Sequence, residues 1–472
     1  MADKFYITTT APYVNAEPHI GFSLEIIAAD VLARYRKILG DNVIFGYGTD
    51  EHGLKIYQKA EERGQDIQEY VDEYAQIYEG LKTKLNLSST HFQRTTNPDH
   101  EAAAQEFWRL CDERGDIYKK FYQVKYCVGC ELEKTDSELV DGKCPLHPNK
   151  DLVLIEEENY FFKFSNYQQP LLDFYAANPE FVRPEGKFKE IKSFVENGLK
   201  DFSISRLKSK MPWGVEVPID SEHVMYVWFD ALVFYISTLG WPEETKEYKD
   251  YWPGVQVAGK DNLRQQSAMW QAMLMSAGLP NSKKVLINGF ISVEGQKMSK
   301  SVGNVISPEE MLDKYGVDAT RFLIMQLGPV SGDMDVSWNQ FDKSYESYLA
   351  NSLGNTVQRV ATLCDRSGMK YAQDNPPGYR SQVIEQMGMY RFDKALEEIW
   401  KSIAMIEKKI DETQPWKLEG KKLQVTLMEL VAHLRQVGYE LQPFMPETAE
   451  KILTIFKGPK ISKPEPMFPR LD

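Results

Sequence analysis

Apolar and polar positions alternate along the first part of the chain in a way that predicts a strand, a helix and a second strand. The apolar segment 5–10 is typical of a buried strand, and after a polar loop apolar residues recur on one helical face until Gly40. Residues 43–48 read as another buried strand, followed by the polar loop 49–53. Both loops would lie at carboxyl ends of parallel strands, where doubly wound sheets bind nucleotides.

A similar pattern returns after residue 216. Segments 224–232, 255–261 and 284–290 are strand-like, and residues 263–280 between the last two are helical. We therefore predict one α/β domain of Rossmann type, interrupted by an insertion and joined by right-handed crossovers.

The C-terminal third has a different pattern. Ser307, Pro308 and Glu310 are the residues expected at the start of a helix, and strand signals stop after about residue 345. Amphipathic stretches at 348–363 and 422–442 then predict a helical bundle. The predicted parts are a first Rossmann half at 1–116, an insertion at 117–215, a second Rossmann half at 216–295, a loop and linking region at 296–344, and the helical domain at 345–472.

Composition narrows the class of protein. The 472 residues are 42% hydrophobic, yet no apolar run approaches the ~20 residues that span a bilayer, and no signal peptide opens the chain. We expect a cytoplasmic protein that does not enter membranes, and a monomer. The net charge of −13 argues against indiscriminate binding of nucleic acid but allows a local basic groove.

Three of the five cysteines lie close together with a histidine. Cys127, Cys130, Cys144 and His147 form a C-x2-C-x13-C-x2-H pattern, which is typical of a zinc site. Four protein ligands leave no open position for water, so we expect one structural Zn²⁺. Cys111 and Cys364 stand apart, and we expect ordinary buried thiols there.

Two short motifs predict a triphosphate site. KMSKS at 297–301 places two lysines on a loop that flanking glycines would leave free to move, and they could neutralise charge that develops on pyrophosphate. PHIGF at 18–22 opens the first helix, where His19 could donate to a phosphate. Taken alone, KMSKS could equally be a solvated basic loop.

The motifs together resemble one family. TTAPYVNAEPHIG, GTDEHGLKI, YCVGCE, GLKDFSISR, YVWFDAL, AGKD and GQKMSKSVGN resemble the text of methionyl-tRNA synthetases, which are class I aminoacyl-tRNA synthetases, and the likeness spans essentially the whole chain. It implies that methionine and Mg²⁺-bound ATP give methionyl-adenylate, and that the methionyl group then passes to tRNA(Met). The short insertion speaks against the isoleucine, leucine and valine enzymes, which need a hydrolytic editing site.

The resemblance also implies roles for individual residues. The implied methionine site comprises Ala11, Tyr13, Asp50, Trp228, Ala231, Leu232, Tyr235, Gln266 and Trp270. The implied ATP site comprises His19, Gly21, Gly259, Asp261, Lys297, Ser299 and Lys300, of which His19, Lys297 and Lys300 would be catalytic. Asn355, Arg359 and Trp416 resemble anticodon readers, although a polar helix face and a packing tryptophan would explain them as well.

Two departures from the family pattern leave alternatives open. Phe22 replaces a histidine, and Gln265 and Gln266 replace a Phe-His pair. We hypothesise that His52 or Mg²⁺ compensates for Phe22, and that the enzyme is active. The alternatives are a relative that activates another small amino acid, and an inactive relative that only binds tRNA.

Overall fold

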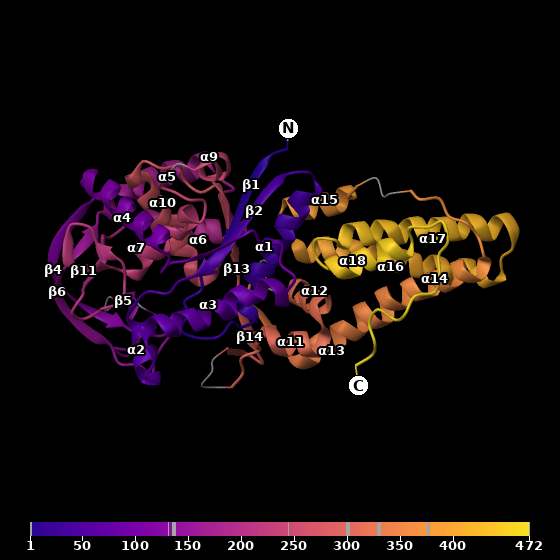
Figure 1. Ribbon diagram of the computed structural model, residues 1–472, viewed down its shortest axis with the longest axis horizontal. Helices are drawn as coiled ribbons and strands as arrows, with labels where there is room; N and C mark the ends of the chain where they lie inside the picture. Colours follow the sequence, from indigo (N-terminus) through magenta and orange to yellow (C-terminus); the bar gives the residue numbers. More distant parts are fainter. Residues whose placement is uncertain are drawn as a thin grey trace. The chain divides into compact units, whose positions relative to one another are not determined.

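The chain folds into two compact units. The computed structural model describes residues 2–130, 132–134, 138–243, 245–298, 303–327, 332–374 and 378–471. Unit 1 comprises Met1–Glu17, Asn42–Lys82 and Ser89–Ile287, and unit 2 comprises Pro18–Asp41, Thr83–Ser88 and Asn288–Asp472 (Figure 1).

Unit 1 is built on a six-stranded sheet, which contains the strands predicted at 5–10, 43–48, 255–261 and 284–290. Its strand order is β3 (His91–Arg94), β2 (Asn42–Thr49), β1 (Lys4–Thr9), β12 (Val255–Gly259), β13 (Lys284–Asn288), β7 (Val182–Arg183). The pairings of β1 with β2 and β12, of β2 with β3 and of β13 with β7 are parallel. Ile7 of β1 is in register with Phe45 and Val255, and all three are buried, as expected for strands covered on both faces.

Smaller sheets and helices complete unit 1. One sheet has the order β5 (Leu132–Lys134), β4 (Ile117–Cys127), β6 (Val153–Phe162), β8 (Phe202–Ser203), and another has β10 (Glu216–Val217), β11 (Asp220–Met225), β9 (Ser205–Leu207). The helices are α2 (Leu54–Arg63), α3 (Ile67–Lys84), α4 (Pro98–Glu113), α5 (Gln168–Ala177), α6 (Glu185–Glu196), α7 (Val227–Ala231), α8 (Phe234–Ser237), α9 (Lys246–Tyr251) and α10 (Trp270–Ala277), and Gln265–Met269 forms a π-helical turn. Strand β7 belongs to the segment predicted as the insertion, yet it forms an edge of the main sheet.

The prediction of a strand at 224–232 is wrong over most of its length. Strand β11 ends at Met225, and residues 227–231 form helix α7. Short apolar runs do not distinguish a strand from a buried helix, so tertiary packing decides between them. Here Phe229 packs with its ring 5.8 Å from Phe107 and 5.2 Å from Trp108, both on α4.

Unit 2 contains α1 and the C-terminal helices. Helix α1 (Ile20–Ile38) ends one residue before Leu39, and Gly40 has a φ of 100°, which agrees with the predicted end. The other helices are α11 (Pro308–Tyr315), α12 (Val317–Leu327), α13 (Trp338–Ser344), a π-helical stretch at Tyr345–Gly354, α14 (Asn355–Ser367), α15 (Ser381–Gly388), α16 (Phe392–Thr413), α17 (Gly420–Leu441) and α18 (Pro446–Ile455). A small sheet has the order β15 (Gln296–Lys297), β14 (Ile291–Val293), β16 (Met334–Val336). Ser307 and Glu310 form the predicted capping box of α11.

The predicted helical character of the C-terminal third is confirmed. Helices α14, α16 and α17 contact one another, and α18 packs on α17 (Figure 1). Buried residues of α16 recur every three or four positions, including Leu396, Ile399 and Ile403. Such a stripe buries one face of a helix and leaves the other to solvent. No helix within the described ranges combines the length and the apolar character needed to cross a membrane.

Candidate active site and metal centre

The residues implied to bind methionine all lie in unit 1. Main-chain hydrogen bonds join the loop that carries Tyr13 to the loop that carries Asp50. Residues Tyr13 and Asp50 form an isolated parallel bridge beyond the ends of β1 and β2. The amide of Asp50 donates to Pro12 O over 2.9 Å, and the amide of Val14 donates to Asp50 O over 3.1 Å. Gly48 allows β2 to approach strand β3 closely, because a Cβ at position 48 would lie 1.7 Å from the carbonyl oxygen of Gln93. The two loops at the carboxyl edge of the sheet are therefore held together.

Helices α7 and α8 bring the aromatic residues of the implied site to the same region. Trp228 packs with Tyr13 against a small buried cluster, whereas Leu232 and Tyr235 belong to the main core of unit 1. The ring of Trp270 lies 6.0 Å from that of Tyr235. The implied residues thus fall into two hydrophobic clusters, and helix α7 connects the two clusters.

Gln266 and Gln265 fill the two positions where the sequence departs from the family. Both side chains are buried, and Nε2 of Gln266 donates to the hydroxyl of Tyr235. Oε1 of Gln266 and Nε1 of Trp228 are buried without a hydrogen-bond partner in the described part of the chain. Because such atoms are costly to leave unpaired, each could bond to an ordered water or to a polar group of a ligand.

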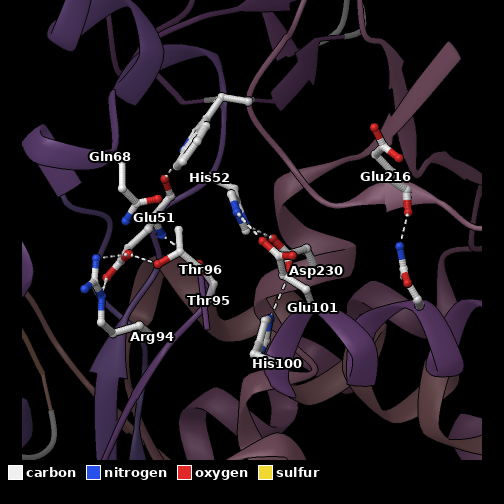
Figure 2. Close-up of polar contacts among 12 residues, drawn as sticks. Glu51, His52, Gln68, Arg94, Thr95, Thr96, His100, Glu101, Glu216 and Asp230 are labelled. Carbon is white, nitrogen blue, oxygen red and sulfur yellow. Dashed lines mark hydrogen bonds and ion pairs between the residues drawn. The ribbon is translucent and has the colours of Figure 1, made fainter. Parts of the chain in front are cut away.

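A buried network of polar side chains joins the loop after β2 to helix α7. Nδ1 of His52 lies 2.6 Å from Oδ2 of Asp230, and Nε2 of His100 lies 2.8 Å from Oδ1 of the same carboxylate (Figure 2). Burial opposes ionisation of Asp230, but the charge of His52 and the bonds from both histidines hold the pKa of Asp230 at about 2. Burial also opposes a charged His52, yet the Asp230 carboxylate raises the pKa of His52. Both shifts favour an ion pair.

This network was not found by the sequence reasoning. His52 and Asp230 each stand inside a recognised motif, but nothing in the motifs indicates that the side chains meet across 178 positions of the chain. The hypothesis that His52 compensates for Phe22 stays a prediction; Nδ1 of His52 is bonded to Asp230. Phe22 itself is 8% exposed and forms part of the hydrophobic core.

A main-chain hydrogen bond within unit 2 joins the start of α1, beside His19, to a residue five positions after the KMSKS motif. The amide of Ile20 donates to Ile306 O over 3.0 Å, and a Cβ on Gly21 would lie 3.7 Å from Cε of Met298. Nδ1 of His19 accepts from the Gly21 amide over 3.0 Å, so a neutral ring carries its proton on Nε2. The main chain of Lys297 belongs to β15, whereas Ser299 and Lys300 lie outside the described residues.

The other two residues of the implied ATP site follow β12 in unit 1. Gly259 precedes the short 3-10 turn Lys260–Asn262, and Asp261 is exposed on that turn. A Cβ on Gly259 would lie 2.7 Å from Oδ1 of Asp261, so glycine leaves this carboxylate room at the end of the strand.

The predicted metal ligands converge in unit 1. One donor atom from each of Cys127, Cys130, Cys144 and His147 lies within 4.8 Å of all the others. Nδ1 of His147 lies 3.8 Å from Sγ of Cys127 and 3.1 Å from Sγ of Cys130. Ligands around a tetrahedral ion with ~2.3 Å bonds are ~3.8 Å apart, so this group of side chains fits a metal ion.

The surroundings of the cluster also suit a metal. A Cβ on Gly129 would lie 2.5 Å from the ring of His147, so a larger residue would displace the imidazole. Burial and the hydrogen bonds that the Cys130 thiol donates to its neighbouring cysteines raise the pKa of Cys130 to about 12. Metal binding would therefore release a proton from this thiol. Cys111 and Cys364 are free, buried thiols, as expected.

The residues that resemble anticodon readers lie on the helical part of unit 2. Asn355 is exposed at the first position of α14, and the guanidinium of Arg359 lies 3.1 Å from Asp411. Trp416 is 55% exposed in the turn Pro415–Lys417. More than half of the Trp416 side chain is thus open to solvent, and its role as an anticodon reader or as a packing residue stays a prediction.

Comparison with known proteins assigns the family. The sequence matches the family described as tRNA synthetases class I (M) over residues 5–152 and 149–361. A methionine–tRNA ligase of Caldanaerobacter subterraneus subsp. tengcongensis is 39% identical, over 100% of this chain and 80% of its own length. That of Thermotoga maritima is 38% identical, over 95% of this chain and 74% of its own.

A solved structure gives the same result for the fold. Mycobacterium tuberculosis methionyl-tRNA synthetase in complex with methionyl-adenylate has a TM-score of 0.91 to this chain at 34% identity, and each chain is covered to 100%. Because sequence and fold agree along the whole chain, it belongs to the class I tRNA synthetases (M), the family of the methionine–tRNA ligases.

Proposed function

We propose that this protein activates L-methionine with ATP and transfers the methionyl group to the 3′ end of tRNA(Met). Two groups of contacts in unit 1 support the proposal: Tyr13 bridges Asp50 and packs with Trp228 against one buried cluster, and the rings of Tyr235 and Trp270 lie 6.0 Å apart. The family match spans all of these residues. Membership of the family supplies the ATP-dependent ligase activity.

The side chains at this end of the sheet suit methionine. Aromatic rings such as those of Trp228, Tyr235 and Trp270 receive a polarizable thioether favourably. The carboxylate of Asp50 would attract the ammonium group of the amino acid. Gln266, bonded to Tyr235, offers its buried Oε1 to a donor on the ligand or on an ordered water.

The first step needs no general base, because the attacking methionine carboxylate is already ionised. Its oxygen forms a bond to the α-phosphorus of ATP while the bond to the bridging oxygen breaks, and pyrophosphate leaves. ATP would enter as its Mg²⁺ complex, which neutralises part of the phosphate charge. His19 would donate from Nε2 to the triphosphate, and Lys297 and Lys300 would neutralise the departing pyrophosphate. Gly21, Gly259, Ser299 and Asp261 are assigned to the remaining contacts of ATP.

In the second step a hydroxyl of the terminal ribose of tRNA attacks the methionyl carbonyl, and AMP leaves. Residues 345–472 would bind the anticodon arm, with Asn355 and Arg359 bonding to base edges and exposed Trp416 stacking on a base. Residues 296–344 would carry the KMSKS loop and contact the stem. The two Rossmann halves at 1–116 and 216–295 would hold the adenylate.

The cysteine and histidine cluster is assigned to one structural Zn²⁺ in the segment 117–215. Three thiols and an imidazole are the donor set of closed zinc sites, and four protein ligands leave no position for a reacting water. Cys127, Cys130, Cys144 and His147 would hold the ion, which would stabilise their loops and take no part in the reaction.

Pyrophosphate exchange across a panel of amino acids, followed by aminoacylation of tRNA(Met), tests the proposal. Methionine should support exchange far better than leucine, norleucine or homocysteine, and acylated tRNA should follow. Efficient exchange with a different amino acid would favour the alternative that this protein is a relative which activates another small amino acid. No exchange with any amino acid, combined with tRNA binding, would identify the inactive relative.

A further inference from the structure

The carboxylate of Asp230 has no direct part in the steps above, yet it is one of the most completely surrounded polar groups in unit 1. Its two oxygens accept from two different histidines, His52 over 2.6 Å and His100 over 2.8 Å (Figure 2). Nδ1 of His100 in turn lies 2.8 Å from Oγ of Ser237. All four side chains are buried.

These bonds join four elements of unit 1. His52 stands in the loop after β2, two residues beyond Asp50, whereas His100 lies on α4. Asp230 lies on α7 between Trp228 and Ala231, and Ser237 is on α8, two residues after Tyr235. His52, Asp230 and Ser237 thus each lie within two residues of a residue assigned to the methionine site, whereas His100 joins them from α4.

The loop after β2 is also fixed on its other side. The neighbouring Glu51 accepts two hydrogen bonds of 2.8 Å from Arg94, and its main-chain oxygen accepts from Nε1 of Trp213 over 2.6 Å (Figure 2). The Glu51 amide donates to Oγ1 of Thr95 over 2.9 Å. With these bonds in place, the His52–Asp230 contact links α7 directly to the loop that carries Asp50.

Stability alone does not explain a buried carboxylate of this kind. Replacing a buried ion pair by apolar residues of similar volume is often neutral or stabilising, so such pairs are weak evidence for a purely structural role. A group of fixed hydrogen bonds does, however, hold two binding surfaces in one relative position, which lowers the entropy lost when a ligand binds.

We propose that Asp230 is a positioning residue for methionine binding, which holds helix α7 with Trp228 and Ala231 at a fixed distance from the loop that presents Asp50. The inference rests on the proposed function and deepens it. His100, itself bonded to Ser237, orients the carboxylate from the side of α4.

The first test replaces Asp230 by asparagine, which keeps the shape but turns one acceptor into a donor that faces a histidine. In pyrophosphate exchange, Asp230→Asn should raise the KM for methionine about tenfold or more, as expected when a bond to a charged group is lost. The KM for ATP and the kcat at saturating methionine should change less than about threefold, because the lost contact supports ground-state and transition-state binding alike.

A matched control separates positioning from general destabilisation. Asp116 is another buried carboxylate of unit 1, and it accepts from Ser276 over 2.8 Å and from the hydroxyl of Tyr167. None of these residues is assigned to the methionine site. Asp116→Asn should lower Tm and leave the KM for methionine unchanged.

A second pair of variants keeps the inference testable if Asp230→Asn does not fold. In His100→Gln the side-chain amide can replace Nε2 as donor to Asp230, whereas His100→Leu cannot. We expect a near-normal methionine KM for His100→Gln and a raised one for His100→Leu. Equal methionine KM values for both, or methionine and ATP KM values that rise together in Asp230→Asn, would overturn the inference. A wild-type protein without methionine-dependent exchange would instead overturn the proposed function itself.

Discussion

The main-chain amide of Ile20 donates to the carbonyl oxygen of Ile306 over 3.0 Å, and this bond joins the chain beside His19 to the chain that follows KMSKS, the two motifs assigned to the triphosphate. Ile20 follows His19 at the start of α1, and Ile306 lies just beyond the KMSKS segment. The contact lies within unit 2, so the base of the KMSKS segment is anchored to the helix whose N-terminus would face the triphosphate.

His19→Ala should slow methionine-dependent pyrophosphate exchange by about 10²- to 10³-fold, the usual effect of losing one donor to transition-state charge. The KM for methionine should change little, because the residues assigned to methionine binding lie on other elements. The loss of the cap on α1 should lower stability by only about 1 kcal/mol. His91→Ala is the control, since His91 contacts Glu247 and belongs to no assigned site.

Gly129→Ala should reduce the metal content of the purified protein although it changes no ligand. The new methyl group would overlap the ring of His147 at 2.5 Å and push a donor away from the cluster. Metal analysis of the same sample used for assay measures the effect. Gly186→Ala, on α6 with nothing within 4 Å of the added carbon, should bind as much metal as the wild type. Equal metal content in both variants would contradict the assignment.

Arg321→Met should destabilise unit 2 by about 3–5 kcal/mol, because it removes one of the two guanidinium groups that pair with buried Asp30 and leaves buried carbonyl oxygens without their donor. The guanidinium lies 2.7 Å from Oδ2 of Asp30, and both side chains are fully buried. It also donates to Leu85 O and Phe444 O. Denaturant unfolding measures the change, and Lys408→Ala, which removes an exposed pair with Glu412, should have little effect.

The stability lost in Asp230→Asn should depend on pH. Asp230 has a lowered pKa, so its contribution is present above the unfolded value of about 3.9 and is lost as the pH falls towards 2. His52 has a raised pKa, so its contribution is complete below about 6.5 and is lost as the pH rises through its folded pKa. The difference in unfolding free energy between wild type and variant should therefore be largest between about pH 4 and 6.5. A difference that stays constant from pH 3 to 9 would argue against the ion pair.

Trp416→Ala should weaken aminoacylation of tRNA(Met) and leave pyrophosphate exchange intact. The indole is 55% exposed, and stacking on a base contributes ~1–3 kcal/mol. The KM for tRNA should rise accordingly. Met405→Ala removes another 55% exposed apolar side chain of the helical region and serves as the control. A tRNA KM that is equal in the two variants would remove Trp416 from the anticodon contacts.

Much of the architecture followed from local patterns. Strands β1, β2, β12 and β13 and the capping box at Ser307 were predicted, because long apolar runs and cap residues act within a few positions of the chain. The spacing of Cys127, Cys130, Cys144 and His147 likewise predicted a metal cluster, since short ligand loops determine their own geometry.

Other features required the tertiary structure. The sequence by itself determined the motifs, the order of strands and helices and the kinds of chemistry available. Only packing decided that residues 227–231 are helical, that Phe22 is buried, and that Asp230 lies between His52 and His100. These outcomes depend on side chains from elements more than a hundred residues apart, and the free energy of such contacts exists only once the core has closed around them.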